Sequence, residues 1–175
     1  MTSSSRSLPF IVVLALALSG CTGPSEPTPP PSPSPSTTAE ATPTPTPTLV
    51  DCPDILSADG NAKLAADGLE PRDPRVVDPF AVRLVDAGGV ACTWVKAQTD
   101  LVLTVVQLPV PDSEWNAWET ALLEADFVDS TGSGTLFTGP IEVGSGVSPV
   151  VVASGDRITF LNTPAFADLL APHTI

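Results

Sequence analysis

The most informative segment for the fold of this chain is Leu101-Val102-Leu103-Thr104-Val105-Val106-Gln107-Leu108. Side chains along a strand point alternately to opposite faces of a sheet, and here apolar residues fall on both faces. A strand with two apolar faces is typical of the middle of a sheet rather than its edge. The polar Gln98-Thr99-Asp100 before it predicts a turn, and Pro109-Val110-Pro111 ends it. We therefore predict a central strand over residues 101–108.

Two more strands are predicted immediately upstream. Val90–Val95 is rich in β-branched and aromatic residues, which favour strands. Gly88-Gly89 precedes it as an expected turn, and Ala81–Val85 is expected to be the other strand of this hairpin. A loop rich in proline and charge, Glu70–Pro79, comes before them.

Helices are predicted on both sides of these strands. Apolar residues recur at helical spacing between Ile55 and Leu69, with Gly68 as the expected C-terminal stop and Gly60 inside the segment. After Pro111, Asp112 or Ser113 is expected to cap a second helix through its side chain. The apolar face of that helix falls at i, i+3, i+7 and i+10: Trp115, Trp118, Leu122 and Ala125.

The rest of the chain adds strands and one short helix. They are a strand within Thr135–Val143, a strand at Val150–Ala153, a turn at Gly155-Asp156, a return strand at Arg157–Leu161 and a helix at Ala165–Leu170. The fold class that follows is α+β, a mostly antiparallel sheet with helices packed on it in a two-layer sandwich. We assign it to a single globular domain, residues 49–175, which is long enough to bury one core.

The first twenty residues have the pattern of an export signal. Arg6 lies in a polar opening segment, and an apolar run follows at Phe10–Leu18. That run is too short to cross a hydrocarbon core of about 30 Å, which takes about twenty residues, but it suits a signal peptide. It ends in Leu18-Ser19-Gly20-Cys21, which resembles the lipobox of bacterial lipoproteins. We predict a signal peptide over 1–20 and a lipid on Cys21, and an ordinary signal peptide ending near a cysteine is the alternative.

A lipid on Cys21 would hold the protein on the extracytoplasmic face of the cell membrane, because two acyl chains suffice for stable anchoring. The segment 21–48 that follows is almost wholly Pro, Ser and Thr after its cysteine. Such a composition cannot form a core, and its prolines favour an extended polyproline II conformation. We predict a tether that reaches on the order of 80 Å when extended. A proline-rich ligand for a partner is the alternative.

The two remaining cysteines are Cys52 and Cys92. Thiols of an exported domain meet an oxidising compartment and usually pair. A Cys52–Cys92 bridge would close a loop of about forty residues and stabilise the fold by roughly 3–4 kcal/mol. Two separate buried thiols are the alternative.

Several of these residues resemble a known family. Cys52 followed by Pro53-Asp54-Ile55-Leu56 and a short helix, then Cys92-Thr93-Trp94, then paired strands and a helix, is similar to a family of actinobacterial lipoproteins of unknown function. In that family a lipobox and a Pro/Thr/Ser-rich linker precede the domain. The resemblance covers most of Val50–Leu170 and implies a disulfide that joins the first helical region to a sheet strand. It implies no catalytic residue, and Trp115 and Trp118 fall outside its pattern.

Charge and chemistry narrow the function. Arg6 is the only charged residue among the first twenty, so cleavage takes the net charge from −13 to −14. This net negative charge argues against binding to nucleic acid and against adsorption to anionic lipid. We find no catalytic motif: the only histidine is His173, near the C-terminus, and neither Gly-x-Ser-x-Gly nor Ser-x-x-Lys occurs. We therefore predict no enzymatic activity and no cofactor.

Metal binding is also not expected. Pairing of Cys52 and Cys92 removes the ligands that zinc or copper prefers. Two oxygen-rich loops, Asp126–Gly132 and Asp59–Asn61, lack the spacing of a calcium loop, and Asx turns explain them equally well.

The three tryptophans are the remaining candidates. Trp94 is two residues from Cys92 on one strand, so both should face the same core. The face with Trp115 and Trp118 either packs on the sheet or leaves a ring exposed as a partner contact. We predict an accessory or adapter domain for an envelope protein, with a small-ligand binder (lipid, sugar or peptide) as the alternative and an unrecognised hydrolase as a third hypothesis. The oligomeric state is left open.

Overall fold

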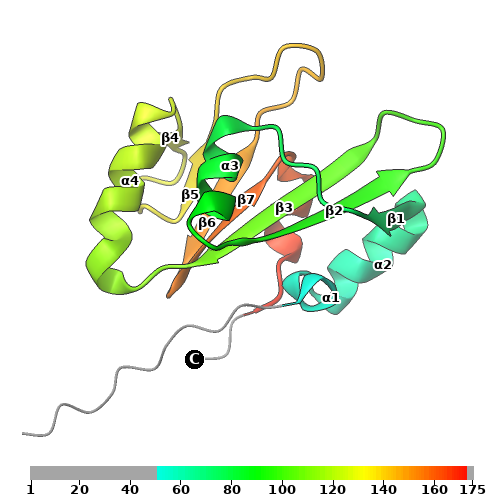
Figure 1. Cartoon of the computed structure of the whole chain (residues 1–175), viewed down its shortest axis with the longest axis horizontal. Helices are drawn as coiled ribbons and strands as arrows, with labels where there is room; N and C mark the ends of the chain where they lie inside the picture. Colours follow the sequence, from blue (N-terminus) through cyan, green and yellow to red (C-terminus); the bar gives the residue numbers. More distant parts are fainter. Residues whose placement is uncertain (1–50, 173–175) are drawn as a thin grey trace, which may run out of the picture. The chain divides into compact units, whose positions relative to one another are not determined.

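A computed structural model describes residues 51–172 of this chain (Figure 1). They lie in the second of the two units into which the chain divides, Pro43–Ile175. The α+β class and the antiparallel sheet are as predicted. Cys21, the predicted signal peptide 1–20, the whole of the predicted tether 21–48 and His173 lie outside the described residues.

One seven-stranded sheet, antiparallel throughout, organises the described residues, in the order β1-β2-β3-β7-β6-β5-β4. Its strands are β1 Leu69–Arg72, β2 Val90–Lys96, β3 Val102–Pro109, β4 Val128–Asp129, β5 Leu136–Thr138, β6 Val150–Ser154 and β7 Arg157–Leu161. The α-helices are α1 Cys52–Ile55, α2 Ala58–Asp67, α3 Pro79–Asp86 and α4 Trp115–Glu124. The 3₁₀ segments are η1 Asp112–Glu114 and η2 Pro164–Leu169.

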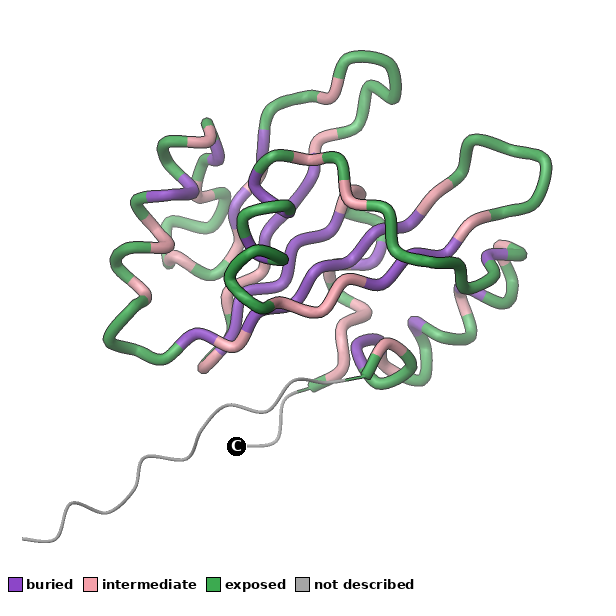
Figure 2. The backbone as a smooth tube through the Cα atoms, in the orientation of Figure 1, coloured by how far each residue is buried: buried purple, intermediate pink, exposed green. Residues whose placement is uncertain are grey.

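β3 is the central strand that its composition predicts. It pairs with β2 on one side and with β7 on the other. Val105 and Val106 point to opposite faces, and each is fully buried. Figure 2 shows the buried backbone concentrated in these middle strands.

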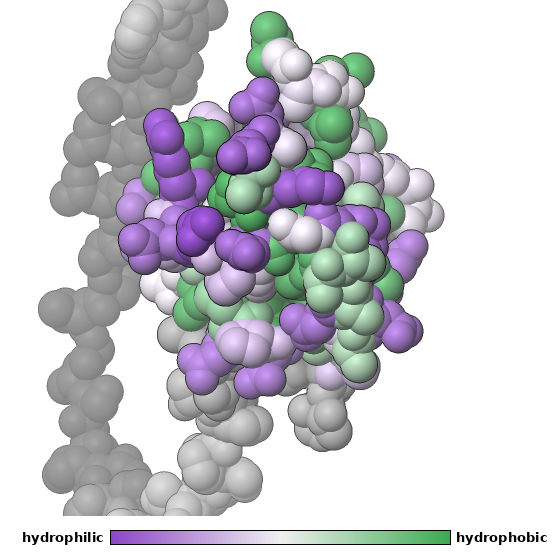
Figure 3. Space-filling view, turned by 90° about the vertical axis from the view of Figure 1, so that its right-hand side faces the viewer, coloured by the Kyte–Doolittle hydropathy of each residue, from purple (hydrophilic) through white to green (hydrophobic). Residues whose placement is uncertain are grey.

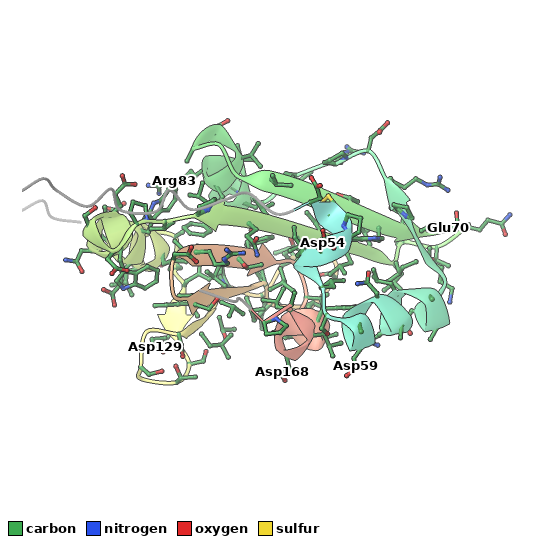
Figure 4. All side chains as sticks on the ribbon, turned by 90° about the horizontal axis from the view of Figure 1, so that it is seen from below. Asp54, Asp59, Glu70, Arg83, Asp129 and Asp168 are labelled. Carbon is green, nitrogen blue, oxygen red and sulfur yellow. A yellow bond between two sulfur atoms is a disulfide. The ribbon has the colours of Figure 1, made fainter. Side chains whose placement is uncertain are left out.

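Helices cover both faces of the sheet, which makes three layers where the sequence predicted two. α3 and α4 pack with Val106, Ile158 and Phe160 in one core cluster. The helical segments α1, α2 and η2 pack with Val105 and Leu161 in a second cluster. Figure 4 shows the separation: Arg83 of α3 lies on one side of the sheet, and Asp59 of α2 and Asp168 of η2 lie on the other.

The strand predicted at Ala81–Val85 is wrong, because this segment forms α3. The Asp78 carboxylate caps the helix by accepting hydrogen bonds from the amides of Phe80 at 2.8 Å and Ala81 at 2.9 Å. Pro79 occupies the first helical position, where its missing N–H costs nothing. Phe80, Ala81 and Leu84 are buried at helical spacing. The segment is short and contains β-branched valines, which favour strands, so a strand was predicted in place of the helix that Asp78 caps.

The single helix predicted between Ile55 and Leu69 is two helices. Leu56 and Ser57 interrupt it, and the Ser57 hydroxyl caps α2 by accepting from the Gly60 amide at 3.2 Å. Gly68 ends α2 in a left-handed conformation at φ 70°, as predicted.

The second half of the chain follows its prediction with smaller differences. β6 and β7 form the predicted hairpin, in which Ser154 pairs with Arg157 across Gly155-Asp156. Neither Asp112 nor Ser113 caps α4, because both lie in η1, the 3₁₀ turn that leads into the helix. The strand predicted within 135–143 is only β5.

Cys52 and Cys92 form the predicted disulfide, with Cα atoms 5.6 Å apart. The bridge joins α1 to β2, so the alternative of two separate thiols is wrong. Trp94 lies in the same core cluster as Cys92, as their spacing predicts. Within residues 51–172, none of the helices has the length and apolar character needed to span a bilayer.

Candidate binding groove

A groove of about 620 Å³ opens on the side of the sheet that carries α3. Its floor consists of outward-facing residues of three neighbouring strands and the residue that follows β7: Thr93, Val95, Val102, Thr104, Phe160 and Asn162. One wall is the extended segment 72–78 between β1 and α3, and the other is the loop 142–147 between β5 and β6. We call this feature the sheet groove.

The sheet groove exists because α3 is short. Its eight residues cover β3 near Val106 but do not reach the cross-strand pair Val95–Val102. The Arg75 amide donates to the Thr93 hydroxyl at 3.3 Å, which ties the 72–78 wall to β2. The open part of the sheet is therefore framed by two loops and filled by no side chain.

Two threonines form the polar centre of the floor. Thr93 and Thr104 are directly opposite each other in β2 and β3, and they are only 5% and 7% exposed. The Thr104 hydroxyl has no hydrogen-bond partner in the described residues, whereas every fully enclosed side-chain polar atom there has one. The Thr104 hydroxyl is therefore open to the sheet groove and is free to bind a ligand.

Asn162, at the edge of the floor, has a structural role. Its Oδ1 accepts from the Thr104 amide at 2.9 Å and its Nδ2 donates to the Val102 carbonyl at 3.0 Å. These bonds continue the β3–β7 ladder past the end of β7. The Asn162 amide group is thus already used, in contrast to the Thr104 hydroxyl.

Exposed hydrophobic side chains gather around the sheet groove. Nine large hydrophobic side chains are exposed in the described residues, and three of them line the groove: Val77, Leu101 and Val147. Two more, Ile141 and Val143, are the sequence neighbours of the lining residue Glu142. Ile141 is 70% exposed and Val143 completely so. Figures 1 and 3 show the β5–β6 loop uppermost, with hydrophobic residues at its tip. Exposed apolar surface that clusters in this way is typical of an interaction site.

The charged groups around the sheet groove are mostly acidic. Arg72 pairs with Glu70 at 3.4 Å, the Asp78 carboxylate caps α3, and Glu142 accepts from the Ser145 hydroxyl at 3.1 Å. The lining residues Asp73, Arg75 and Asp100 take part in no ion pair within the described part of the chain. The rim therefore has more negative than positive charge.

Trp115 and Trp118 lie outside the sheet groove, on the inner side of α4. Trp118 contacts Phe80 edge-on at 6.2 Å between ring centroids, and Trp115 contacts Phe137 at 6.2 Å. Both indoles are half-buried against the core. Packing on the core accounts for their spacing, and a partner contact at these rings stays a prediction.

Asp129 uses its carboxylate to hold the 129–135 loop closed. Oδ1 accepts from the amides of Thr131 and Gly132, both at 2.9 Å, and Oδ2 accepts from the Gly134 amide at 2.8 Å. These bonds, led by the one from Gly134, lower the pKa of the Asp129 carboxyl below its ordinary 3.8, against a smaller opposing effect of desolvation. The Asx-turn interpretation therefore accounts for this oxygen-rich loop. No cluster of three or more potential metal ligands occurs in residues 51–172.

Comparisons with known protein families, curated sequences and solved structures give no match to this chain. The sheet groove could not be predicted from the sequence, because its lining residues come from segments between Arg72 and Thr163, up to about ninety positions apart. The available signals were Thr93 and Thr104 in otherwise apolar strands and the exposed valines of the β5–β6 loop. None of these indicates a groove until the strands are placed in order.

Proposed function

We propose that this chain is a lipid-anchored extracytoplasmic protein whose domain is a non-enzymatic adapter that binds another envelope protein through the sheet groove. One observation carries the binding role: of the nine exposed large hydrophobic side chains in the described residues, three line the groove and two more belong to the loop that forms one of its walls. The lipobox-like Leu18–Cys21, the proline-rich tether and the resemblance to actinobacterial lipoproteins support the location. The disulfide is consistent with an oxidising compartment.

Site-specific photo-crosslinking in the cell that makes the protein tests the adapter role. A benzoylphenylalanine replaces Leu101 or Val143, on opposite sides of the sheet groove, or Leu123 on the outside of α4. Leu123 is a matched control because it is 58% exposed and Leu101 is 50% exposed. We expect the same protein, identified by mass spectrometry, to be crosslinked from Leu101 and Val143 and not from Leu123. Equal products at all three positions, or none at Leu101 and Val143, would contradict the proposal.

The second candidate is a small-ligand binder, and the size of the sheet groove favours it. About 620 Å³ lies within the usual range of ligand pockets, about 300–1,000 Å³. Native mass spectrometry of the protein extracted from its own membrane separates the two candidates. A small-molecule adduct that survives desalting, without a protein crosslink at the rim, would replace the adapter with a carrier.

The same spectrum tests the anchor. We expect the mature chain to begin at Cys21 and to carry the mass of a diacylglyceryl group. An unmodified chain that begins at Thr22 or earlier would disprove the lipid anchor.

A further inference from the structure

The sheet groove has three properties that restrict its occupant: an extended rim, an unpaired hydroxyl and an acidic surround. The following inference rests on the proposed function, because it names the chemistry of the segment that the adapter binds. Each property excludes a different class of ligand.

The rim indicates an occupant that extends beyond the cavity. Val77, which is 72% exposed, lines the 72–78 wall, and Ile141 and Val143, 70% and 105% exposed, are neighbours of Glu142 in the loop that forms the other wall. A small molecule enclosed in the groove would leave them in water. A longer chain crossing the groove would cover them and gain the free energy of their burial.

The floor indicates a backbone. Thr93 and Thr104 are a cross-strand pair, so their Cβ atoms are about 5 Å apart. The Thr93 oxygen already accepts from the Arg75 amide and keeps its proton for donation, whereas the Thr104 hydroxyl can both donate and accept. A peptide group offers one acceptor and one donor, which matches this pair. A plain hydrocarbon chain would leave the Thr104 hydroxyl buried and unpaired.

The charges indicate a basic occupant. Two acidic residues that line the groove, Asp73 and Asp100, form no ion pair within the described residues, whereas Arg75 is the one lining arginine there that forms none. The whole chain has a net charge of −13. This field repels fatty-acid carboxylates, anionic lipid headgroups and acidic peptides, and it attracts lysine and arginine.

We infer that the sheet groove binds an extended peptide segment of the partner that has apolar side chains and at least one lysine or arginine. Its backbone hydrogen-bonds to the hydroxyls of Thr93 and Thr104. Its apolar side chains cover Val95, Val102 and the exposed rim, and its basic residue lies near Asp73 or Asp100.

Selection of peptides on the intact protein tests this inference. Randomised nine-residue peptides displayed on phage are selected on the full chain held in lipid nanodiscs, with empty nanodiscs as the background. We expect the enriched peptides to combine several Val, Ile, Leu or Phe residues with an excess of Lys and Arg over Asp and Glu. Enrichment of acidic peptides, or no enrichment above the empty nanodiscs, would overturn the inference.

The best peptide, labelled with fluorescein, is then measured by anisotropy against variants of the chain. We expect Thr104→Val to weaken binding about fivefold, which is the loss of one hydrogen bond. Thr120→Val on α4 is the matched control, because Thr120 is exposed and its hydroxyl bonds only to the Asn116 carbonyl; we expect no change. Asp100→Asn should weaken binding at low salt and have less effect at high salt.

Unchanged affinity in Thr104→Val would place the peptide elsewhere and overturn the inference. If the crosslinks at Leu101 and Val143 identify a partner but the peptides fail, the adapter function stands and only the chemistry of its ligand is wrong. If both fail, the proposed function fails as well.

Discussion

At the scale of single residues, Thr104 and Thr159 show how one side chain can serve binding or stability. Both are strand residues that are more than nine-tenths buried. The Thr159 hydroxyl accepts from Gln107 Nε2 at 3.1 Å, and Gln107 in turn accepts from Arg157 at 3.0 Å. The Thr104 hydroxyl has no partner in the described residues. A hydroxyl that faces the open groove adds no hydrogen bond to the fold, whereas the paired Thr159 hydroxyl contributes to the folding free energy.

We therefore expect Thr104→Val to leave the domain as stable or up to about 1 kcal/mol more stable, since no hydrogen bond is lost. Thr159→Val should destabilise the domain by about 1–3 kcal/mol, because it leaves Gln107 Nε2 without an acceptor. Urea denaturation of the two variants measures both effects. A Thr104→Val variant as unstable as Thr159→Val would mean that the Thr104 hydroxyl is structural.

Asp129 gives a prediction for pH. Because its hydrogen bonds lower the carboxyl pKa in the folded protein, the loop is stabilised above the ordinary pKa of 3.8, and this contribution is lost as the pH falls through the lower folded value. We expect the amide proton shifts of Gly132 and Gly134 to titrate together in NMR spectra with a midpoint below 3.8. In Asp129→Asn that titration should be absent. A midpoint above 3.8 would show that the carboxylate does not bind these amides.

At the scale of secondary-structure elements, Gly60 in α2 shows packing overriding helix propensity. Gly→Ala in a helix usually stabilises by about 1 kcal/mol. A Cβ on Gly60, however, would lie 2.7 Å from the Leu169 carbonyl oxygen and 3.0 Å from the Leu56 Cβ atom. The backbone of η2 approaches α2 so closely that only glycine fits between them.

We expect Gly60→Ala to destabilise the domain by about 1–3 kcal/mol, because η2 must move away from α2. The melting temperature measures the effect. The sign of the change is decisive: a higher melting temperature would mean that helix propensity dominates and that η2 gives way without cost.

At the scale of the whole molecule, the disulfide connects the N-terminal helices to the sheet. Cys52 lies at the start of α1 and Cys92 inside β2, with a sequence separation of 40. Closing a loop of this length restricts the unfolded chain and stabilises the fold by about 3–4 kcal/mol.

We expect a reductant to lower the unfolding free energy of the wild-type chain by about 3–4 kcal/mol. The double variant Cys52→Ala/Cys92→Ala, which has no bond to reduce, should be insensitive to the reductant. Guanidinium denaturation with and without dithiothreitol measures both. A wild-type protein unaffected by complete reduction, verified by its free-thiol content, would contradict the prediction.

Features that depend on neighbouring residues and on the composition of short segments could be predicted from the amino-acid sequence. The two apolar faces of Leu101–Leu108 indicated a central strand, Gly155-Asp156 indicated a hairpin turn, and Gly68 indicated a helix end. The pairing of Cys52 with Cys92 followed from the number of cysteines and from the predicted compartment. Such features are local or combinatorial, so they can be predicted before the fold is known.

Which surfaces are covered depends on the packing of distant elements and became known only from the three-dimensional structure. α3 was predicted as a strand because five residues show no clear period, and its helix depends on a cap at Asp78 and on burial of Phe80 and Leu84 against β3. The half-burial of the α4 indoles and the close approach at Gly60 likewise depend on distant partners. The sheet groove is the clearest case, since it lies beyond the end of α3, between two walls, 72–78 and 142–147, that come from opposite halves of the domain's sequence. Burial is a property of packed elements and not of any one segment, so the candidate site could be located only after the strands had been placed in order.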